Sequence, residues 1–182
     1  KHFVSKEAFN IDGLGKKIVE NFWNLKLIRL PQDIFNLDYN KIEQLEGWGK
    51  VSAANLKFSI EQKKKISFER YIYSLGIRHI GQENAKLIAR HLKTLDNFLK
   101  LSNSKNTDGL SNIDGIGISQ VQSIKKFFLN KTNLKVLHEL DKNLLVANVI
   151  LQNNNGLLKN KTFMLTGKLN GISRAEAKSL IE

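Results

Sequence analysis

Two glycines separated by one apolar residue, directly before a helical pattern, constrain this chain more than any other feature. The fullest example is Ile113-Asp114-Gly115-Ile116-Gly117, followed by Ile118-Ser119-Gln120-Val121. Glycine adopts backbone angles that a Cβ disfavours, so this spacing predicts a tight turn. The helix after the second glycine begins with amide groups that have no acceptor inside it, and its dipole makes that end positive. The pattern predicts a backbone cup for an anion, with DNA phosphate as one candidate.

The pattern recurs along the chain, and we call the copies corners 1 to 4 (residues 11–15, 45–49, 77–81 and 113–117). The earlier copies read Ile11-Asp12-Gly13-Leu14-Gly15, Leu45-Glu46-Gly47-Trp48-Gly49 and Ile77-Arg78-His79-Ile80-Gly81, with His79 at the first glycine position of the third. The second glycines are 34, 32 and 36 residues apart. An internal repeat of this period indicates a repeated supersecondary unit, here a helix–turn–helix. The alternative is four such units that only pack together.

Composition limits the kind of protein this sequence encodes. A chain of 182 residues forms one or two domains with a real core. Its 29 Lys and Arg against 17 Asp and Glu give a net charge of +12, which favours a polyanionic partner but also serves solubility. There is no cysteine, which excludes disulfides and thiolate metal sites, and no apolar run long enough to span a membrane. The chain begins with Lys-His and stops inside a helical pattern, so we expect a piece of a longer protein.

Apolar residues recur at helical spacing after each corner and predict a helix there. Lys16 and Lys17 open the first of these helices, and two lysines in a first turn oppose the helix dipole unless an anion lies nearby. Further helix starts are indicated by N-cap residues at Asp38, Thr94 and Thr132. The last of these helices is expected to bury Leu134, Leu137 and Leu140.

The pattern changes near the C-terminus. Residues 152–156 (Gln-Asn-Asn-Asn-Gly) have the composition of a linker. Residues 162–166 read as a strand ended by Gly167, and Ser173-Arg174-Ala175-Glu176 is a capping box that opens a helix. We therefore expect an all-α domain over 1–152, a linker over 153–156, and the beginning of an α/β domain over 157–182.

The residues of the four corners resemble the helix-hairpin-helix region of the bacterial NAD-dependent DNA ligases. The resemblance also rests on residues 2–6 (His-Phe-Val-Ser-Lys), on residues 50–56 (Lys-Val-Ser-Ala-Ala-Asn-Leu) and on Leu75-Gly76. Residues 158–167 resemble the opening of the BRCT domain of that family. The resemblance runs through nearly the whole chain in order. It implies four helix-hairpin-helix motifs packed as one all-α domain, followed by a short α/β fragment, a truncated BRCT domain.

The resemblance implies one part of an enzyme that seals nicks in DNA during replication and repair. In the family, a lysine within a Lys-x-Asp-Gly motif takes AMP from NAD, and no such motif occurs here. The four-cysteine zinc module of the family would lie upstream of Lys1. NAD, magnesium and zinc are thus implied for the parent enzyme, with no cofactor, metal ligand or catalytic residue in this fragment, which should be inactive alone. The implied location is the bacterial cytoplasm, at the nucleoid.

The resemblance further implies that this region grips nicked double-stranded DNA from the minor-groove side, through its phosphates. We expect binding that is insensitive to sequence, because phosphate contacts carry no sequence information directly. No membrane partner is expected, and the chain is expected to be monomeric. The residues expected to contact DNA are Gly13, Gly15, Lys16, Lys17, Gly47, Gly49, Lys50, Arg78, Gly81, Gly115, Gly117, Ser119 and Gln120.

Other readings stay open at this point. The chain is alternatively a non-enzymatic helix-hairpin-helix scaffold from another DNA repair or recombination protein, which the sequence upstream of Lys1 would distinguish. In a third reading it is an all-helical protein-interaction module whose corners are only turns. A glycosylase built on one hairpin would need a catalytic lysine and aspartate context that is missing here, and would not need four corners.

Overall fold

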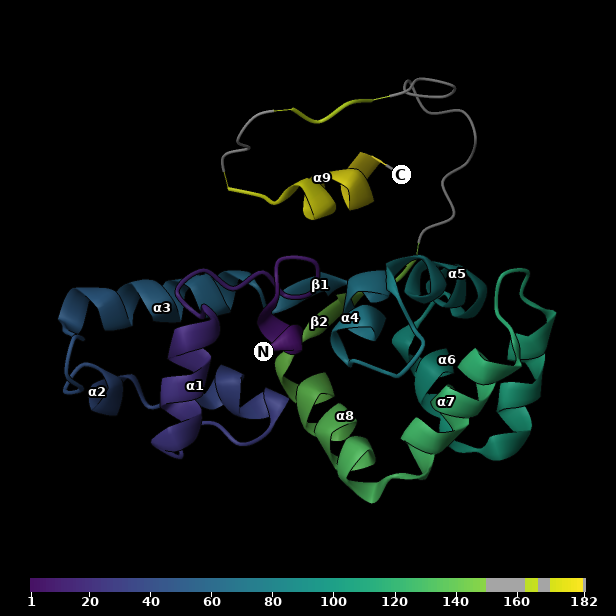
Figure 1. Ribbon diagram of the computed structural model, residues 1–182, viewed down its shortest axis with the longest axis horizontal. Helices are drawn as coiled ribbons and strands as arrows, with labels where there is room; N and C mark the ends of the chain where they lie inside the picture. The colour runs from purple at the N-terminus through teal and green to yellow at the C-terminus, as the bar shows by residue number, and fades with distance from the viewer. Residues whose placement is uncertain (150–162, 167–170, 182) are drawn as a thin grey trace.

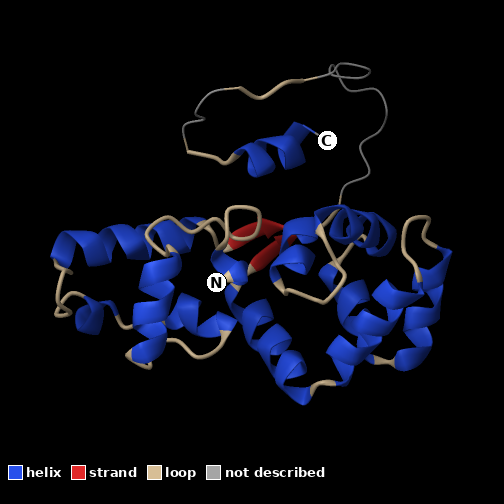
Figure 2. Cartoon of the chain, in the orientation of Figure 1, coloured by secondary structure: helices blue, strands red, loops and turns tan. Residues whose placement is uncertain are grey.

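The computed structural model of the chain describes residues 1–149, 163–166 and 171–181, and helices dominate these parts (Figure 2). The N-terminal half contains η1 (His2–Val4), α1 (Lys16–Asn24), η2 (Pro31–Asn36), α2 (Tyr39–Ile42), α3 (Lys50–Gln62) and β1 (Lys65–Ser67), where η marks a 3₁₀ helix. The C-terminal half contains α4 (Phe68–Ser74), α5 (Gln82–Leu92), α6 (Leu95–Leu99), η3 (Lys100–Ser102), η4 (Ser104–Asn112), α7 (Ile118–Leu129), α8 (Lys131–Asn143) and β2 (Leu145–Ala147). Helix α9 (Arg174–Ile181) follows near the C-terminus.

The helices lie in two groups along the long axis of the molecule. Figure 1 places α1, α2 and α3 at one end and α5, α6 and α7 at the other, with β1, β2, α4 and α8 between them. We call residues 1–149 the hairpin body. Corners 1 and 2 therefore belong to one end and corner 4 to the other, while corner 3 lies where α4 passes into α5.

The expected all-α fold is wrong at one place. Strands β1 and β2 pair in parallel, with Lys65 opposite Leu145 and Ser67 opposite Ala147. The ladder is extended by the Leu145 amide, which donates to the Lys64 carbonyl at 2.8 Å. Lys65, three residues after the end of α3, is thus a strand residue. Strands of three residues are too short to show a period-two pattern, so no alternation of apolar and polar residues predicts them.

A single apolar core runs through both halves. Phe22, Phe68 and Phe98 are fully buried, and the Phe98 ring centroid lies 5.1 Å from that of Phe128. Full burial of a side chain of this size contributes ~1.5–3 kcal/mol. Residues 68, 71, 72 and 75 form one helical face, with the first three buried and Leu75 partly buried.

Two of the three expected N-caps are confirmed and one is wrong. The Asp38 side chain accepts from the amides of Asn40 and Lys41, and the Thr94 hydroxyl accepts from the Asn97 amide. Helix α8 instead begins after Asn130, whose side chain accepts from the Thr132 and Asn133 amides. Asn130, two positions before Thr132, supplies the same kind of acceptor, so Thr132 falls inside the first turn.

The buried face of α8 also differs from the expected one. Leu137 and Leu140 are buried, as expected, but Leu134 is 36% exposed and Val136 is buried in its place. At 100° per residue, Val136, Leu137 and Leu140 lie on one side of the helix and Leu134 lies on its flank.

Of the features expected near the C-terminus, the capping box is formed and the strand is not. The strand expected over residues 162–166 is not formed in residues 163–166, and Thr162 lies outside the described residues. The capping box is confirmed, because the Ser173 amide donates to Glu176 Oε2 at 2.7 Å and the Glu176 amide donates to Ser173 Oγ at 3.1 Å. The linker expected over 153–156 lies outside the described residues, so the domain boundaries stay a prediction.

Candidate nucleic-acid interface

The four corners share one backbone conformation. In each, the amide of the middle apolar residue donates to the carbonyl three residues earlier, which gives the pairs Leu14–Ile11, Trp48–Leu45, Ile80–Ile77 and Ile116–Ile113 at 2.9–3.3 Å. The residue before the middle position has a positive φ in every copy: Gly13 +83°, Gly47 +76°, His79 +63° and Gly115 +85°. His79 thus occupies the glycine conformation that its place in the repeat predicts.

The second glycine of each corner is extended and begins the next helix. Its carbonyl accepts the first intrahelical bond from a buried residue, in the pairs Val19–Gly15, Ala53–Gly49, Ala85–Gly81 and Val121–Gly117. The middle residue is buried in corners 1, 3 and 4, and Trp48 is half-buried in corner 2. The corner glycines are exposed apart from half-buried Gly49. Apolar side chains therefore anchor each corner while its glycines face solvent.

The corners differ in what their second glycine amide binds. The Gly49 amide donates to Ser52 Oγ at 2.9 Å, and the Gly117 amide donates to Gln120 Oε1 at 3.1 Å. Within the described parts of the chain, the amides of Gly15 and Gly81 have no acceptor. Corners 2 and 4 are thus capped by a side chain of their own helix, whereas corners 1 and 3 are open.

Two of the residues expected to contact DNA, Ser119 and Gln120, are hydrogen-bonded to each other in the first turn of α7. Ser119 Oγ donates to Gln120 Oε1 at 2.9 Å, the same oxygen that accepts from the Gly117 amide. This spacing of glycine and Gln120 is a signal that sequence reasoning did not use, and so is that of Gly49 and Ser52. A side chain three residues after an N-cap often bonds back to its amide.

Corners pack in pairs along the chain. A Cβ added at Gly13 would lie 3.4 Å from Leu56 Cδ1 of α3, the helix that follows corner 2. A Cβ added at Gly115 would lie 2.9 Å from Leu87 Cδ1 of α5, the helix that follows corner 3. Corners 1 and 2 therefore form an N-terminal pair and corners 3 and 4 a C-terminal pair.

Charge is distributed unequally between these pairs. Lys16, Lys17 and Lys50 are exposed in the first turns of α1 and α3. Neither of these first turns contains an acidic residue. Arg78 is exposed in corner 3, but Glu83 lies in the first turn of α5. Corners 1, 2 and 4 each also carry one exposed carboxylate, at Asp12, Glu46 and Asp114. The structure places all thirteen expected residues in or directly after a corner.

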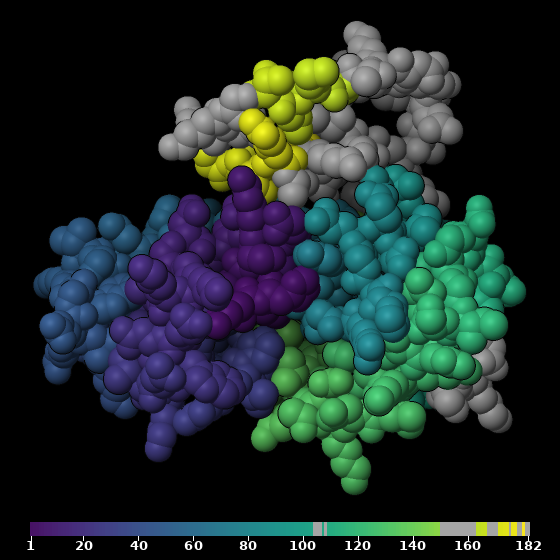
Figure 3. Space-filling view, in the orientation of Figure 1, coloured from purple at the N-terminus to yellow at the C-terminus, as the bar shows by residue number. Residues whose placement is uncertain are grey.

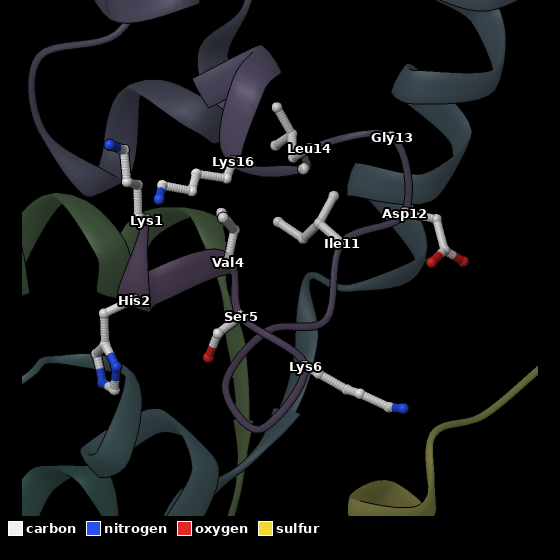
Figure 4. Close-up of a pocket in the computed structure, with 11 residues that line it drawn as sticks. Lys1, His2, Val4, Ser5, Lys6, Ile11, Asp12, Gly13, Leu14 and Lys16 are labelled. Carbon is white, nitrogen blue, oxygen red and sulfur yellow. The ribbon is translucent and has the colours of Figure 1, made fainter. Parts of the chain in front are cut away.

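A hollow of about 550 Å³ lies beside corner 1, lined by the backbone of Gly13 and Gly15 and by Lys1, Lys6 and Lys16 among others. Figure 4 shows the Asp12 carboxylate pointing to the opposite side from the Lys16 side chain. A hydrogen bond from Lys1, with its charge and that of Lys16, holds the pKa of Glu20 below its ordinary value. Lys6 and Lys16 therefore line the space beside the open corner, while Lys1 is paired with Glu20.

Neither a metal cluster nor a membrane span is found in the described residues. No three His, Cys, Asp or Glu side chains gather there as metal ligands. No helix in the same parts of the chain is both long and apolar enough to cross a bilayer.

The comparisons with known proteins find one motif family and a set of DNA ligases to which this chain is similar. The helix-hairpin-helix motif family matches residues 70–137, which contain corners 3 and 4. A DNA ligase of Pelagibacter ubique is 84% identical over 182 residues, covering 100% of this chain and 27% of the relative. DNA ligases of Wolbachia pipientis subsp. Culex pipiens (43% over 182 residues, 98% and 28%) and Rickettsia bellii (39% over 194 residues, 100% and 28%) are also similar. The chain spans little more than a quarter of these relatives.

Proposed function

We propose that this chain, which is homologous over its whole length to one region of bacterial DNA ligases and contains a helix-hairpin-helix motif, binds double-stranded DNA through its phosphates. The observation that carries the proposal is the repeated corner, which presents an exposed helix N-terminus four times with one backbone conformation. Amides at a helix N-terminus bind phosphate because they lack internal acceptors and lie at the positive end of the dipole. All four corners are, in this proposal, helix-hairpin-helix motifs.

The corner residues would contribute to phosphate binding in different ways, according to their chemical type. Backbone at the corners approaches the phosphate oxygens, with Gly13, Gly15, Gly47, Gly49, Gly81, Gly115 and Gly117 leaving room for it. Lys16, Lys17, Lys50 and Arg78 supply positive charge, and Ser119 and Gln120 supply neutral donors around corner 4. Since phosphate contacts carry no sequence information directly, affinity should not depend on base sequence. Neutralising about five phosphates would give a slope of roughly −4.5 for log affinity against log salt.

We further propose that the parent protein is an NAD-dependent ligase that seals nicks in replication and repair, acting in the bacterial cytoplasm at the nucleoid. This region would hold the nicked duplex as a monomer while other parts of the parent perform adenylation. The chain contains no cysteine and no Lys-x-Asp-Gly motif, so its own residues do not fit the zinc or adenylate chemistry of such an enzyme. We assign it no step that uses NAD, magnesium or zinc. Residues 157–182 would begin the BRCT domain.

The second glycines allow a test that leaves the fold intact. Gly15 and Gly81 have ordinary extended φ values, and a Cβ at either would meet no atom within 4 Å. Gly15→Val and Gly81→Val should therefore keep the unfolding free energy while their side chains occupy the space that a phosphate needs. We expect each to weaken binding of a nicked duplex about tenfold, measured by fluorescence anisotropy at ~0.1 M salt.

Gly109→Val is the control for adding a valine side chain elsewhere, because Gly109 also has open space at its Cβ but lies in η4, outside the corners. Thermal unfolding of each variant verifies the fold. If folded Gly15→Val and Gly81→Val bind nicked duplex as the parent chain does, the corners are only turns and the chain is an interaction module of another kind.

A region exchange tests the ligase assignment. We expect the ligase of Rickettsia bellii to seal nicks when its corresponding region is replaced by this chain, which is 39% identical to it. Insertion of the Gly15→Val/Gly81→Val chain should reduce sealing most at low DNA concentration. DNA binding by the chain without any nick sealing by the exchanged enzyme would instead favour a scaffold from another repair or recombination protein.

A further inference from the structure

One carboxylate joins the C-terminal helix to the hairpin body. Glu176 of α9 forms an ion pair with Lys63 at 2.6 Å, and its side chain is 19% exposed. Asn10 Nδ2 donates to Glu176 Oε2 at 3.4 Å, and Arg70 Nη1 lies 3.6 Å from Glu176 Oε1. Ser173 and Ala177 are buried beside it. In Figure 3 the atoms of this segment lie against the N-terminal residues.

On the hairpin body, the Arg70 side chain that faces Glu176 is held in place by hydrogen bonds to backbone carbonyls of the same body. Arg70 is 7% exposed, and its Nε and Nη2 donate to the backbone carbonyl of Ala8, with a further bond from Nη2 to the Lys6 carbonyl at 3.2 Å. Its remaining nitrogen, Nη1, is buried without a hydrogen-bond partner in the described residues and faces Glu176. A buried guanidinium held in this way favours an anion at its free edge.

We infer that Asn10, Lys63 and Arg70 form a notch that receives the Glu176 carboxylate, and that this contact latches the C-terminal part of the chain to the hairpin body. The occupant is a segment of the same chain, chosen by charge complementarity: two cations and one amide donor meet one carboxylate. The capping box of α9 fixes the direction of that carboxylate, because the Ser173 amide holds the same Oε2 atom. The latch does not depend on DNA binding.

The latch also reaches the lead-in to corner 1. Arg70 holds the carbonyls of Lys6 and Ala8, and Asn10, with φ +50°, directly precedes Ile11 of corner 1. The same arginine thus orders the N-terminal loop on one side and faces Glu176 on the other. Docking of α9 should therefore make this loop more rigid.

Titration of Glu176 gives the latch a pH dependence. Burial acts to raise the pKa of Glu176, but hydrogen bonds from Lys63 and the Ser173 amide, with the charges of Lys63 and Arg70, outweigh it and lower the pKa. The pKa of Glu176 is lowered in the docked state, so its carboxylate stabilises docking fully at a pH above the ordinary pKa of a glutamate. This contribution is lost as the pH falls through the lowered pKa of the docked state.

Because the chain has no cysteine, spin labels can be placed at will. We would label Ala54→Cys on α3 and Leu180→Cys on α9, which are both exposed, in the complete 182-residue chain. Double electron–electron resonance should give one narrow distance distribution. Glu176→Gln and Lys63→Gln should each lower the ratio of docked to undocked molecules about tenfold, as expected for a charged hydrogen bond lost in a partly buried site. Glu176→Lys should abolish docking.

Glu139→Gln is the control, since Glu139 forms a more exposed ion pair with Lys142, at 2.9 Å within α8 and away from the notch. A second label pair, Ala54→Cys with Lys135→Cys, reports on the hairpin body and should not change in any variant. Acidification below a pH of about 4 should broaden the α3–α9 distances before those of the second pair. A broad α3–α9 distribution in the unmodified chain, or one unchanged in Glu176→Lys, would overturn the latch.

Discussion

The N-terminal and C-terminal pairs of corners have the same backbone and different charge. Hydrogen bonding and positive φ repeat from corner to corner, whereas lysines follow corners 1 and 2 and no lysine opens the helices after corners 3 and 4. In each pair one second-glycine amide is capped by a side chain and the other is open. Under the proposed function, the shared geometry would receive phosphates at both pairs, while most of the electrostatic attraction would come from the N-terminal pair.

The largest expected effect follows from that unequal charge. Replacing Lys16, Lys17 and Lys50 by glutamine should weaken DNA binding on the order of a hundredfold at ~0.1 M salt and reduce the salt slope by about three. Arg78→Gln in the C-terminal pair should reduce the slope by only about one. Titrations of a labelled nicked duplex at several salt concentrations measure both.

A second triple variant with the same change in net charge separates local from general electrostatics. Lys126, Lys131 and Lys135 are exposed at the junction of α7 and α8, away from the corners. Their replacement by glutamine should lower affinity far less. Equal losses in the two triple variants would mean that net charge, and not the N-terminal pair, attracts the DNA.

A smaller effect is expected on the unfolding free energy when the first glycine of a corner is replaced by alanine. Gly13→Ala and Gly115→Ala both place a Cβ at positive φ, which costs roughly 1–2 kcal/mol. The new Cβ would lie 3.4 Å from Leu56 in the first case but 2.9 Å from Leu87 in the second. Gly115→Ala should therefore lower the unfolding free energy in urea by ~1 kcal/mol more than Gly13→Ala.

Leu87 is the contact that distinguishes these two variants. The Leu87→Ala change should absorb part of the added cost of Gly115→Ala in a double-mutant cycle, since the two residues touch. Equal costs for the two alanine variants would show that Leu87 moves aside freely and that both pairs are packed alike.

The smallest expected effect is at His79. It has a backbone φ of +63°, at the position where the other three corners have glycine. His79→Gly removes the strain of that conformation and should raise the unfolding free energy by ~0.5–1 kcal/mol. Thermal and urea unfolding measure the change. Destabilisation would mean that the imidazole contributes more to corner 3 than its backbone costs.

The repeated corners and most helix starts were predictable because glycine spacing and apolar periodicity are local signals. The positions of the thirteen expected residues at the corners followed from the same pattern, although their contact with DNA stays a prediction. Asn130 shows the limit of such reasoning, since Asn130 and Thr132, two positions apart, each satisfy the N-cap preference and only the structure selects one.

Long-range contacts were not predictable. The partners of β1, and the notch around Arg70, depend on residues far apart in the chain: Arg70 bonds to the Ala8 carbonyl and faces Glu176. Nothing in the sequence near Arg70 distinguishes a buried arginine from a surface one, because its backbone acceptors leave no side-chain pattern. The capping of Gly49 and Gly117 was within reach, since Ser52 and Gln120 stand at the N3 position.

The small parallel sheet has a consequence for how this molecule assembles. Lys65 pairs with Leu145, 80 residues further on, so nearly the entire C-terminal half must be synthesised and collapsed before the ladder closes. Pairing across such a separation raises contact order and slows folding. A ribosome-bound chain that ends before Leu145 would expose β1 as an unpaired edge, and release of residues 145–147 from the exit tunnel should mark the moment at which the two halves become one cooperative unit.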